Sequence, residues 1–372
     1  MKNKLIYVIT IALTLCCCET ELEIDLASFP PKLCVTAILD GEIGNFSITL
    51  SEGRALADFK TPQPYSRTII RNGKISLYEN DNLILIEEGV FDMSYTDYND
   101  NMGYKFFAEG ITTNPGSTYK LEVEVEGYNK VFSTSVMPLP PVVSATIDTT
   151  KVEKKEVVNL YYWGYWDIDW GDDHFWPVKL YWDELETGRN YYALEMFKER
   201  TVISGDPGEW GTEDVLKSGI YSDDITKLQD NPEIERAGGD LDIINSLSDI
   251  GGLYLFDILL MSDISLTPEN NSLSLYKSRE KQTEDYWYPE DSYEKIEINN
   301  KITLRVRHIT NETFKYYRSL RMQDSGVGFF TEPVNIVSNI ENGYGCFTVF
   351  SATNIELVEY NTFMYRYIDE YE

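Results

Sequence analysis

The sequence predicts a mainly β protein, with an N-terminal immunoglobulin-like β-sandwich over residues 32–137 and a second β-rich domain over residues 138–372 that carries a few short helices. Short segments that alternate apolar and polar residues recur between turn residues, which is typical of antiparallel strands. The chain is also rich in Tyr (27), Phe (16) and Trp (7), which favour strands. Three prolines within residues 137–141 interrupt this pattern, and the length of 372 residues exceeds that of one usual core, so we place the domain boundary there.

The first domain is predicted from alternating segments that short loops separate. Asp40-Gly41 and Gly44 mark one hairpin loop, and residues 80–82 mark another. Strict alternation over residues 119–125 places four apolar side chains on one face and three charged ones on the other, which predicts a half-buried strand. About seven strands at this spacing fit an immunoglobulin-like sandwich. The segments with this pattern are residues 33–39, 45–51, 75–79, 83–87, 103–108 and 119–126.

The second domain is predicted from longer and more aromatic segments. Its helix is expected over residues 311–323, where Phe314, Tyr317 and Leu320 form one apolar stripe. A long acidic insertion is expected near residues 204–293, loop-like at first, with a short helix at 225–229 or 241–247, and with a polar surface excursion over 267–293. Within it, residues 253–263 fit either a strand or a buried helix. The predicted strands are residues 160–170 and 176–182 on either side of turn residues 169–173, and then 191–201, 302–309, 334–338 and 346–351.

Residues 1–17 are predicted to be a lipoprotein signal peptide. Lys2 and Lys4 precede a largely apolar stretch of 11 residues, near half of the roughly 20 that a membrane-spanning helix needs. Leu15 lies three positions before Cys18 with two small cysteines between, which is the arrangement that lipoprotein processing requires. We therefore expect a lipid-modified Cys18 followed by an acidic tether over residues 18–31; a plain secretory signal cut elsewhere is the alternative.

The charge of the chain excludes one class of partner. Without residues 1–17 the sequence holds 30 basic and 62 acidic residues, a formal charge near −32. Such a surface repels phosphate backbones, so no nucleic-acid partner is expected. Acyl chains, rather than attraction to anionic lipid, must hold the chain at a membrane.

Residues with catalytic or ligating chemistry are sparse. His174 and His308 lie 134 positions apart, and no zinc, nucleophile-elbow or phosphate-loop motif occurs, so neither a catalytic residue nor a cofactor is expected. His308 is interpreted as a structural residue of a strand. Acidic residues 97–101 and the aspartates of 167–173 are weak candidates for calcium, with solvated turn acids as the alternative. Cys34 and Cys346 are either two buried thiols or a bridge.

One region is densely aromatic, with nine Tyr and Trp residues, five of them Trp, among residues 161–182. Alternate side chains of a strand point to opposite faces, so consecutive aromatics such as Tyr161-Tyr162-Trp163 cannot all enter one core. The remainder must cover a second sheet, a ligand or a partner. The residues predicted to contact a partner, a small molecule or a glycan are Trp163, Trp166, Trp170 and Trp176.

Several motifs resemble the DUF4249 family of Bacteroidota lipoproteins. The most specific is residues 332–347, a proline-started segment with a Ser-Asn-Ile turn and a Gly-Tyr-Gly crossing into the last strand. Cys18 followed by residues 23–26, residues 31–35, and residues 314–320 also match. The pair Cys34 and Cys346, where apolar residues would be expected, and the cysteines before Cys18 depart from the family pattern.

The resemblance implies an outer-membrane lipoprotein found alongside a TonB-dependent transporter, with no active site to carry over. Four acids within residues 19–25 resemble the signal that sends such lipoproteins to the cell surface, although a solvated tether explains them equally. We therefore expect a non-enzymatic, surface-exposed accessory of nutrient uptake. An envelope interaction or adhesion module is the alternative, and a hydrolase acting on glycans or peptides through paired carboxylates is a third hypothesis.

Overall fold

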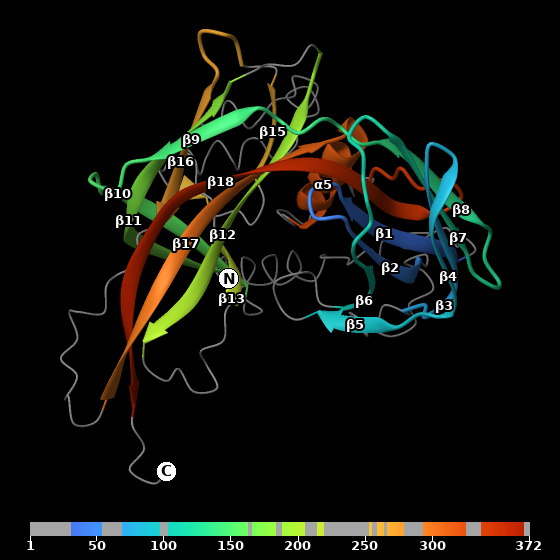
Figure 1. Ribbon diagram of the computed structural model, residues 1–372, viewed down its shortest axis with the longest axis horizontal. Helices are drawn as coiled ribbons and strands as arrows, with labels where there is room; N and C mark the ends of the chain where they lie inside the picture. Colours follow the sequence, from blue (N-terminus) through green and yellow to red (C-terminus); the bar gives the residue numbers. More distant parts are fainter. Residues whose placement is uncertain are drawn as a thin grey trace, which may run out of the picture.

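The computed structural model describes residues 31–53, 69–96, 103–162, 166–183, 188–204, 214–218, 253–254, 259–263, 266–278, 293–324 and 336–367. These residues are mainly β, as predicted, and form three sheets and the helix α5, Asn311–Asp324 (Figure 1). No helix in these ranges is long and apolar enough to cross a membrane.

Sheet A has nine strands and runs through the whole molecule (Figure 1). Its order is β13 (Asp214–Ser218), β12 (Tyr191–Ser204), β17 (Tyr293–Ile309), β18 (Tyr344–Tyr367), β1 (Lys32–Asp40), β2 (Asn45–Gly53), β6 (Gly103–Ala108) and β5 (Met93–Thr96), with β15 (Leu259–Ser262) paired to β12.

Sheets B and C are smaller. Sheet B has the order β4 (Asn82–Val90), β3 (Asn72–Glu79), β7 (Thr118–Glu124) and β8 (Val131–Val136). Sheet C has the order β14 (Leu253–Tyr254), β10 (Glu153–Tyr162), β11 (Trp166–Trp182) and β16 (Ser272–Ser278), with β9 (Val143–Ile147) paired to β11.

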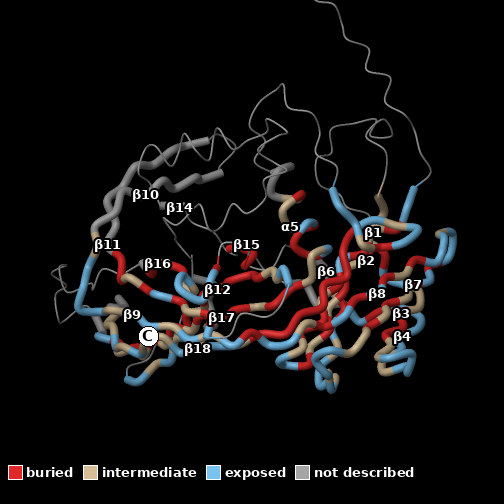
Figure 2. Tube along the Cα trace, turned by 90° about the horizontal axis from the view of Figure 1, so that it is seen from above, coloured by how far each residue is buried: buried red, intermediate tan, exposed pale blue. Residues whose placement is uncertain are grey.

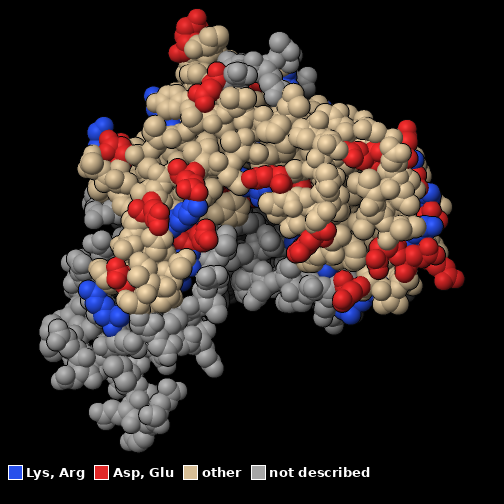
Figure 3. All heavy atoms as spheres, viewed as in Figure 1, with Lys and Arg blue, Asp and Glu red and all other residues tan. Residues whose placement is uncertain are grey.

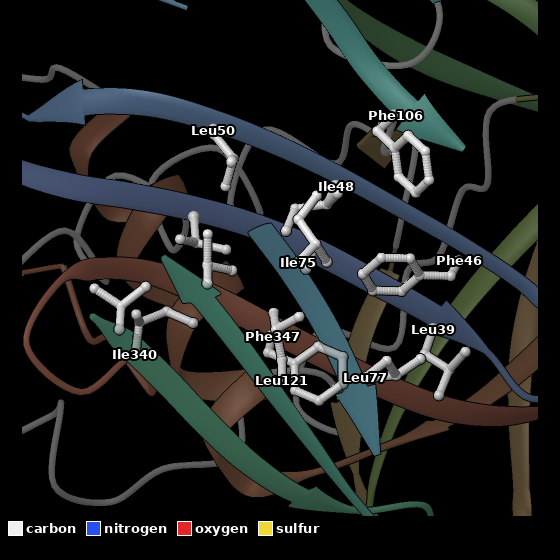
Figure 4. Close-up of a cluster of buried hydrophobic side chains, with 14 of the residues drawn as sticks. Leu39, Phe46, Ile48, Leu50, Ile75, Leu77, Phe106, Leu121, Ile340 and Phe347 are labelled. Carbon is white, nitrogen blue, oxygen red and sulfur yellow. The ribbon is translucent and has the colours of Figure 1, made fainter. Parts of the chain in front are cut away.

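The first core lies between sheets A and B (Figure 4). Alternate residues of β1, from Leu33 to Leu39, are at most 1% exposed, and Phe46, Ile48 and Leu50 of β2 continue the same apolar face. Ile75, Leu77 and Leu121 contribute from sheet B, and Phe347 from β18 completes the cluster. Alternation with one apolar face therefore specifies this part of the fold, as the sequence predicted.

Two further cores lie along sheet A (Figure 2). Leu194, Leu304 and Val306 of sheet A meet Val178 and Leu180 of sheet C in the second core. Residues of opposite parity on the same strands, among them Ala193, Ile309 and Phe350, form the third core with Phe314 of α5. Since alternate residues face opposite sides, sheets B and C cover one face of sheet A and α5 covers the other.

Strand β18 joins the two halves of the chain. It pairs antiparallel with β17 and parallel with β1, from Cys34 opposite Tyr344 to Asp40 opposite Phe350. Strands from both sides of residue 137 therefore share one sheet. The division into domains at that residue stays a prediction, and the immunoglobulin-like arrangement is taken up below as a proposal.

Local sequence explains the best-predicted boundaries. Asn80 and Asp81 form the hairpin turn between β3 and β4 with φ of 47° and 66°, the conformation that such tight turns need. Helix α5 begins after Thr310, whose Oγ1 accepts a hydrogen bond from the backbone N–H of Thr313 at 3.3 Å. The predicted helix is thus confirmed within one residue.

Some expected elements are wrong. Residues 169–173, expected as a turn, lie inside β11 and pair with β10, and the chain reverses within the predicted strand 160–170, because Tyr162 pairs with Trp166. The expected polar excursion contains β16, whose Leu273 and Leu275 are fully buried.

Residues 214–218, expected as loop, form edge strand β13 on β12. Residues 336–338, expected in a strand, lie outside one, and Val337 N–H donates instead to Ser319 Oγ at 3.0 Å.

Other expectations concern residues outside the described ranges. These are the helices at 225–229 and 241–247, residues 1–30, and the acidic residues 97–101. The region 253–263, left open between strand and helix, is strand in β14 and β15.

Candidate functional site

The predicted site residues, Cys18 for lipidation and four tryptophans for contact, divide into three groups. Cys18 and Trp163 lie outside the described residues. Trp166 and Trp170 belong to β11, opposite Tyr162 and Val158 of β10. The side chain of Trp176 lies between sheets A and C, against Tyr360 of β18.

Trp176 is 8% exposed and packs edge-on against Tyr360 of β18, with 5.2 Å between the ring centroids. Asn300 of β17 lies opposite Tyr360 in the sheet and is fully buried. Its Nδ2 donates to Thr362 Oγ1 at 2.8 Å and to the carbonyl oxygen of Tyr360 at 3.3 Å. The tryptophan and the amide therefore flank one tyrosine at the end of the second core.

Two polar atoms at this place lack a hydrogen-bond partner, Trp176 Nε1, a donor, and Asn300 Oδ1, an acceptor. Buried polar groups are nearly always hydrogen-bonded, so the indole N–H calls for a water or ligand atom that accepts, and the amide oxygen calls for one that donates. Buried Lys277, opposite Trp176 on β16, and buried Lys198 of β12 add positive charge to the same core. The arrangement is suited to binding a polar ligand.

A second polar cluster lies on the opposite face of sheet A, the face that α5 covers. Arg305 Nη2 lies 2.6 Å from Asp40 Oδ2 and 3.1 Å from Glu42 Oε2, and Arg307 Nη2 lies 2.6 Å from Glu195 Oε2. Both guanidinium groups also lie over the ring of Phe350, at 5.4 Å and 4.4 Å. The cluster ties β1 and its following turn to β17 and β12, so it links the two halves of sheet A.

The two cysteines near the ends of the folded chain are not joined by a disulfide. Cys34 lies opposite Tyr344 and Cys346 lies opposite Thr36, so the cysteines are two residues out of register on neighbouring strands. Their Cα atoms are then about 8 Å apart, beyond the roughly 7 Å that a disulfide spans. Burial raises the pKa of Cys346 to about 11, which keeps this thiol neutral.

His308 is a buried residue of β17, as its structural interpretation requires. Its Nδ1 lies 2.9 Å from the carbonyl oxygen of Leu139, and its ring packs on Tyr192. Within the part of the chain that the structure describes, no group of three or more His, Cys, Asp or Glu could hold a metal ion.

The comparison with protein families identifies the chain. The family described as "Domain of unknown function (DUF4249)" matches residues 19–356. The chain belongs to the DUF4249 family. A search of curated proteins found no match.

In this DUF4249 chain, sequence reasoning missed Asn300, Glu195 and the role of the two arginines. Arg305 and Arg307 alternate with Leu304 and Val306, which predicts a solvated polar face. Sheet A is covered on both faces at this place, so Arg305 is buried and the side chain of Arg307 is only 16% exposed. No sequence signal reveals them, because the lengths of β17 and β18 and the cover on both faces of sheet A are set by long-range pairing.

Proposed function

We propose that this DUF4249 chain is a non-enzymatic lipoprotein of the outer membrane, exposed at the cell surface, that assists a TonB-dependent transporter in nutrient uptake. One observation carries the proposal: the family match begins at residue 19, directly after Cys18. The family domain thus adjoins the residue expected to be acylated.

The place of the tether within the fold supports a membrane-held receptor. Residues 18–31 precede β1, which lies in the interior of sheet A between β18 and β2. Fully extended, 14 residues reach about 45–50 Å. The folded part of the chain can therefore lie away from the lipid surface. Any force on the anchor then acts on a central strand, which is hydrogen-bonded to a neighbour on both sides, unlike an edge strand.

We propose further that the N-terminal part forms an immunoglobulin-like sandwich. The support is the cluster of buried residues to which strands of sheets A and B contribute, from Leu33 to Val131 and on to Phe347 and Val349. Because β18 supplies Phe347 and Val349, such a sandwich would borrow one strand from the C-terminal end of the chain.

For the ligand, we propose a small hydroxyl-bearing molecule or a glycan at the aromatic region of β11. Trp163, Trp166, Trp170 and Trp176 are the candidate contacts. The support comes from Trp176, where an indole N–H and the amide oxygen of Asn300 both lack hydrogen-bond partners beside Tyr360.

The decisive test is purification of the native chain from detergent-solubilised outer membrane. A stoichiometric barrel partner is expected with the full chain. The variant Cys18→Ala is expected to leave the membrane fraction and to lose the barrel. If the native chain is found unacylated, or is acylated but always alone, the uptake role falls.

A further inference from the structure

One end of the second core is polar on the side of sheet C. Trp176 of β11 and Lys277 of β16 are direct partners in the sheet. Two positions further along, Val178 and Leu275 belong to the second core, so alternation places Trp176 and Lys277 on the same face, toward sheet A. Both residues are buried, at 8% and 2% exposed. An indole N–H and an ammonium group are therefore neighbours between the two sheets.

Sheet A contributes two more polar side chains to this end of the core. Ile302 of β17 is a fully buried core residue; Lys198 of β12 lies opposite it, and Asn300 lies two positions away on its own strand. Asn300 and Lys198 therefore face sheet C, and they are 0% and 7% exposed. Tyr360, opposite Asn300 on β18, is the residue against which Trp176 packs. The two sheets thus bring both polar pairs to the same end of the core.

The amide of Asn300 has a fixed orientation. Its Nδ2 donates to Thr362 Oγ1 at 2.8 Å and lies 3.3 Å from the carbonyl oxygens of both Ile298 and Tyr360. Turning the amide over would place its oxygen against these acceptors, so Oδ1 must accept a hydrogen bond from another group. Because neither Oδ1 nor Trp176 Nε1 has a partner within the protein, the structure leaves one acceptor and one donor for a bound molecule.

The charge at this end of the core is positive. Each lysine ammonium carries three N–H groups, so Lys277 and Lys198 can donate to a ligand in addition to their contacts within the protein. Among the side chains that the structure describes on the facing sides of β11, β16, β12, β17 and β18, none is Asp or Glu. The chain as a whole has a formal charge of −30, and acidic side chains lie on both halves of its surface (Figure 3). The polar end of the core is therefore a local site for an anion.

We infer that this end of the second core binds an acidic sugar, which carries a carboxylate or a sulfate together with free hydroxyl groups. The anionic group accepts hydrogen bonds from Trp176 Nε1 and from the ammonium groups of Lys277 and Lys198, and a hydroxyl group donates to Asn300 Oδ1. The inference rests on the ligand proposed above and adds its charge. A neutral sugar or a water molecule could bond to the indole and the amide, but neither would complement the two ammonium charges.

The first test is calorimetric titration of the full-length, lipidated chain in detergent with three probes, namely glucuronate, glucose 6-sulfate and glucose. At least one of the two acids should bind about tenfold more tightly than glucose or better, since hydrogen bonds between charged groups are roughly twice as strong as neutral ones. The acid with the higher affinity identifies the anionic group.

The second test uses variants that keep the shape of the core. Trp176→Phe keeps an aromatic ring and removes the N–H, and Lys277→Met keeps an unbranched chain and removes the charge. Each should weaken binding of the preferred acid by about tenfold or more. The matched control is Lys179→Met, since Lys179 is exposed on the opposite face of β11, and it should bind like the native chain. Urea denaturation checks that each variant is folded. If Lys277→Met does not fold, Trp176→Phe decides.

Equal affinity for glucose and for both acids would overturn the inference and leave the proposed ligand standing. Unchanged affinity for the acid in folded Trp176→Phe would overturn it too, because the acid would then bind elsewhere. No binding of any probe would also overturn it, since water would then occupy the two unbonded atoms. Recovery of the barrel partner from the outer membrane decides the uptake role separately from all three outcomes.

Discussion

At the residue scale, the ion pair of Arg307 and Glu195 makes the most direct prediction. Glu195 is 1% exposed and has Arg307 at 2.6 Å. Arg307→Met would leave a buried carboxylate without a counter-charge, so the free energy of unfolding should fall by about 3–5 kcal/mol. Urea denaturation measures the loss.

The matched control is the exposed pair of Lys301 and Glu356, where Lys301→Met should cost much less than Arg307→Met, because solvent screens an exposed ion pair. Adding Glu195→Gln to Arg307→Met should recover much of the loss, because the orphan charge is removed. An equal loss in the single and double variants would show that packing of the arginine over Phe350, not charge, is the cause.

The buried thiol of Cys346 predicts a dependence of stability on alkaline pH. Burial raises its pKa from 9 to about 11 in the folded chain, so the folded state holds the thiol proton more tightly than the unfolded state does. This contribution to stability is complete below pH 9 and is lost as the pH rises toward 11. The native chain should therefore lose more stability over this range than Cys346→Ala, by roughly 2–3 kcal/mol. Parallel curves for the two chains in urea denaturation at each pH would contradict the assignment.

At the scale of elements, Gly345 allows β18 to lie beside β1. Its φ is 108°, and a Cβ atom added there would lie 1.9 Å from the carbonyl oxygen of Val35. Gly345→Ala must therefore strain the backbone and also separate two paired strands, so a loss of at least about 3 kcal/mol is expected. Gly116 is the control, with φ of 86° and nothing within 4 Å of an added Cβ. Gly116→Ala should cost only the conformational strain, about 1–2 kcal/mol. Equal urea midpoints for the two variants would rule out the close contact.

Elements were predictable from the sequence where one face is buried and the turn is local. Strands β1, β2 and β7 and the turn at Asn80-Asp81 follow directly from alternation and turn chemistry. Strand β11 could not be predicted in full, because Asp172 and Asp173 resemble turn residues and only pairing with Glu156 and Lys155 of β10 keeps them in a strand. Long-range pairing of this kind also places Asn300 opposite Tyr360, against which Trp176 of a different sheet packs. The candidate site was therefore predictable only as an aromatic segment.

At the scale of the whole molecule, sheet A makes the two halves interdependent. Because β18 lies between β17 and β1, opening either half removes hydrogen bonds and core contacts from the other. A chain of two independent domains divided at residue 137 would instead unfold in two steps. The sequence provides separate reporters for the two halves. All seven tryptophans lie within residues 163–287, whereas Cys346 is buried next to β1.

Urea unfolding followed by tryptophan fluorescence should therefore have the same midpoint as pulsed alkylation of Cys346 followed by peptide mass spectrometry. Gly345→Ala should lower both midpoints together, although the altered residue contacts only the β1 side, since its effect spreads along β18 to β17. Cys346→Ala is the control for the fluorescence curve, because it removes the thiol reporter without altering any tryptophan. Alkylation that is complete at a lower urea concentration, with the fluorescence unchanged, would mean that the halves unfold separately. In that case the pairing of β18 with β1 would add little to the stability of the second half, and the boundary at residue 137 would be a true domain boundary.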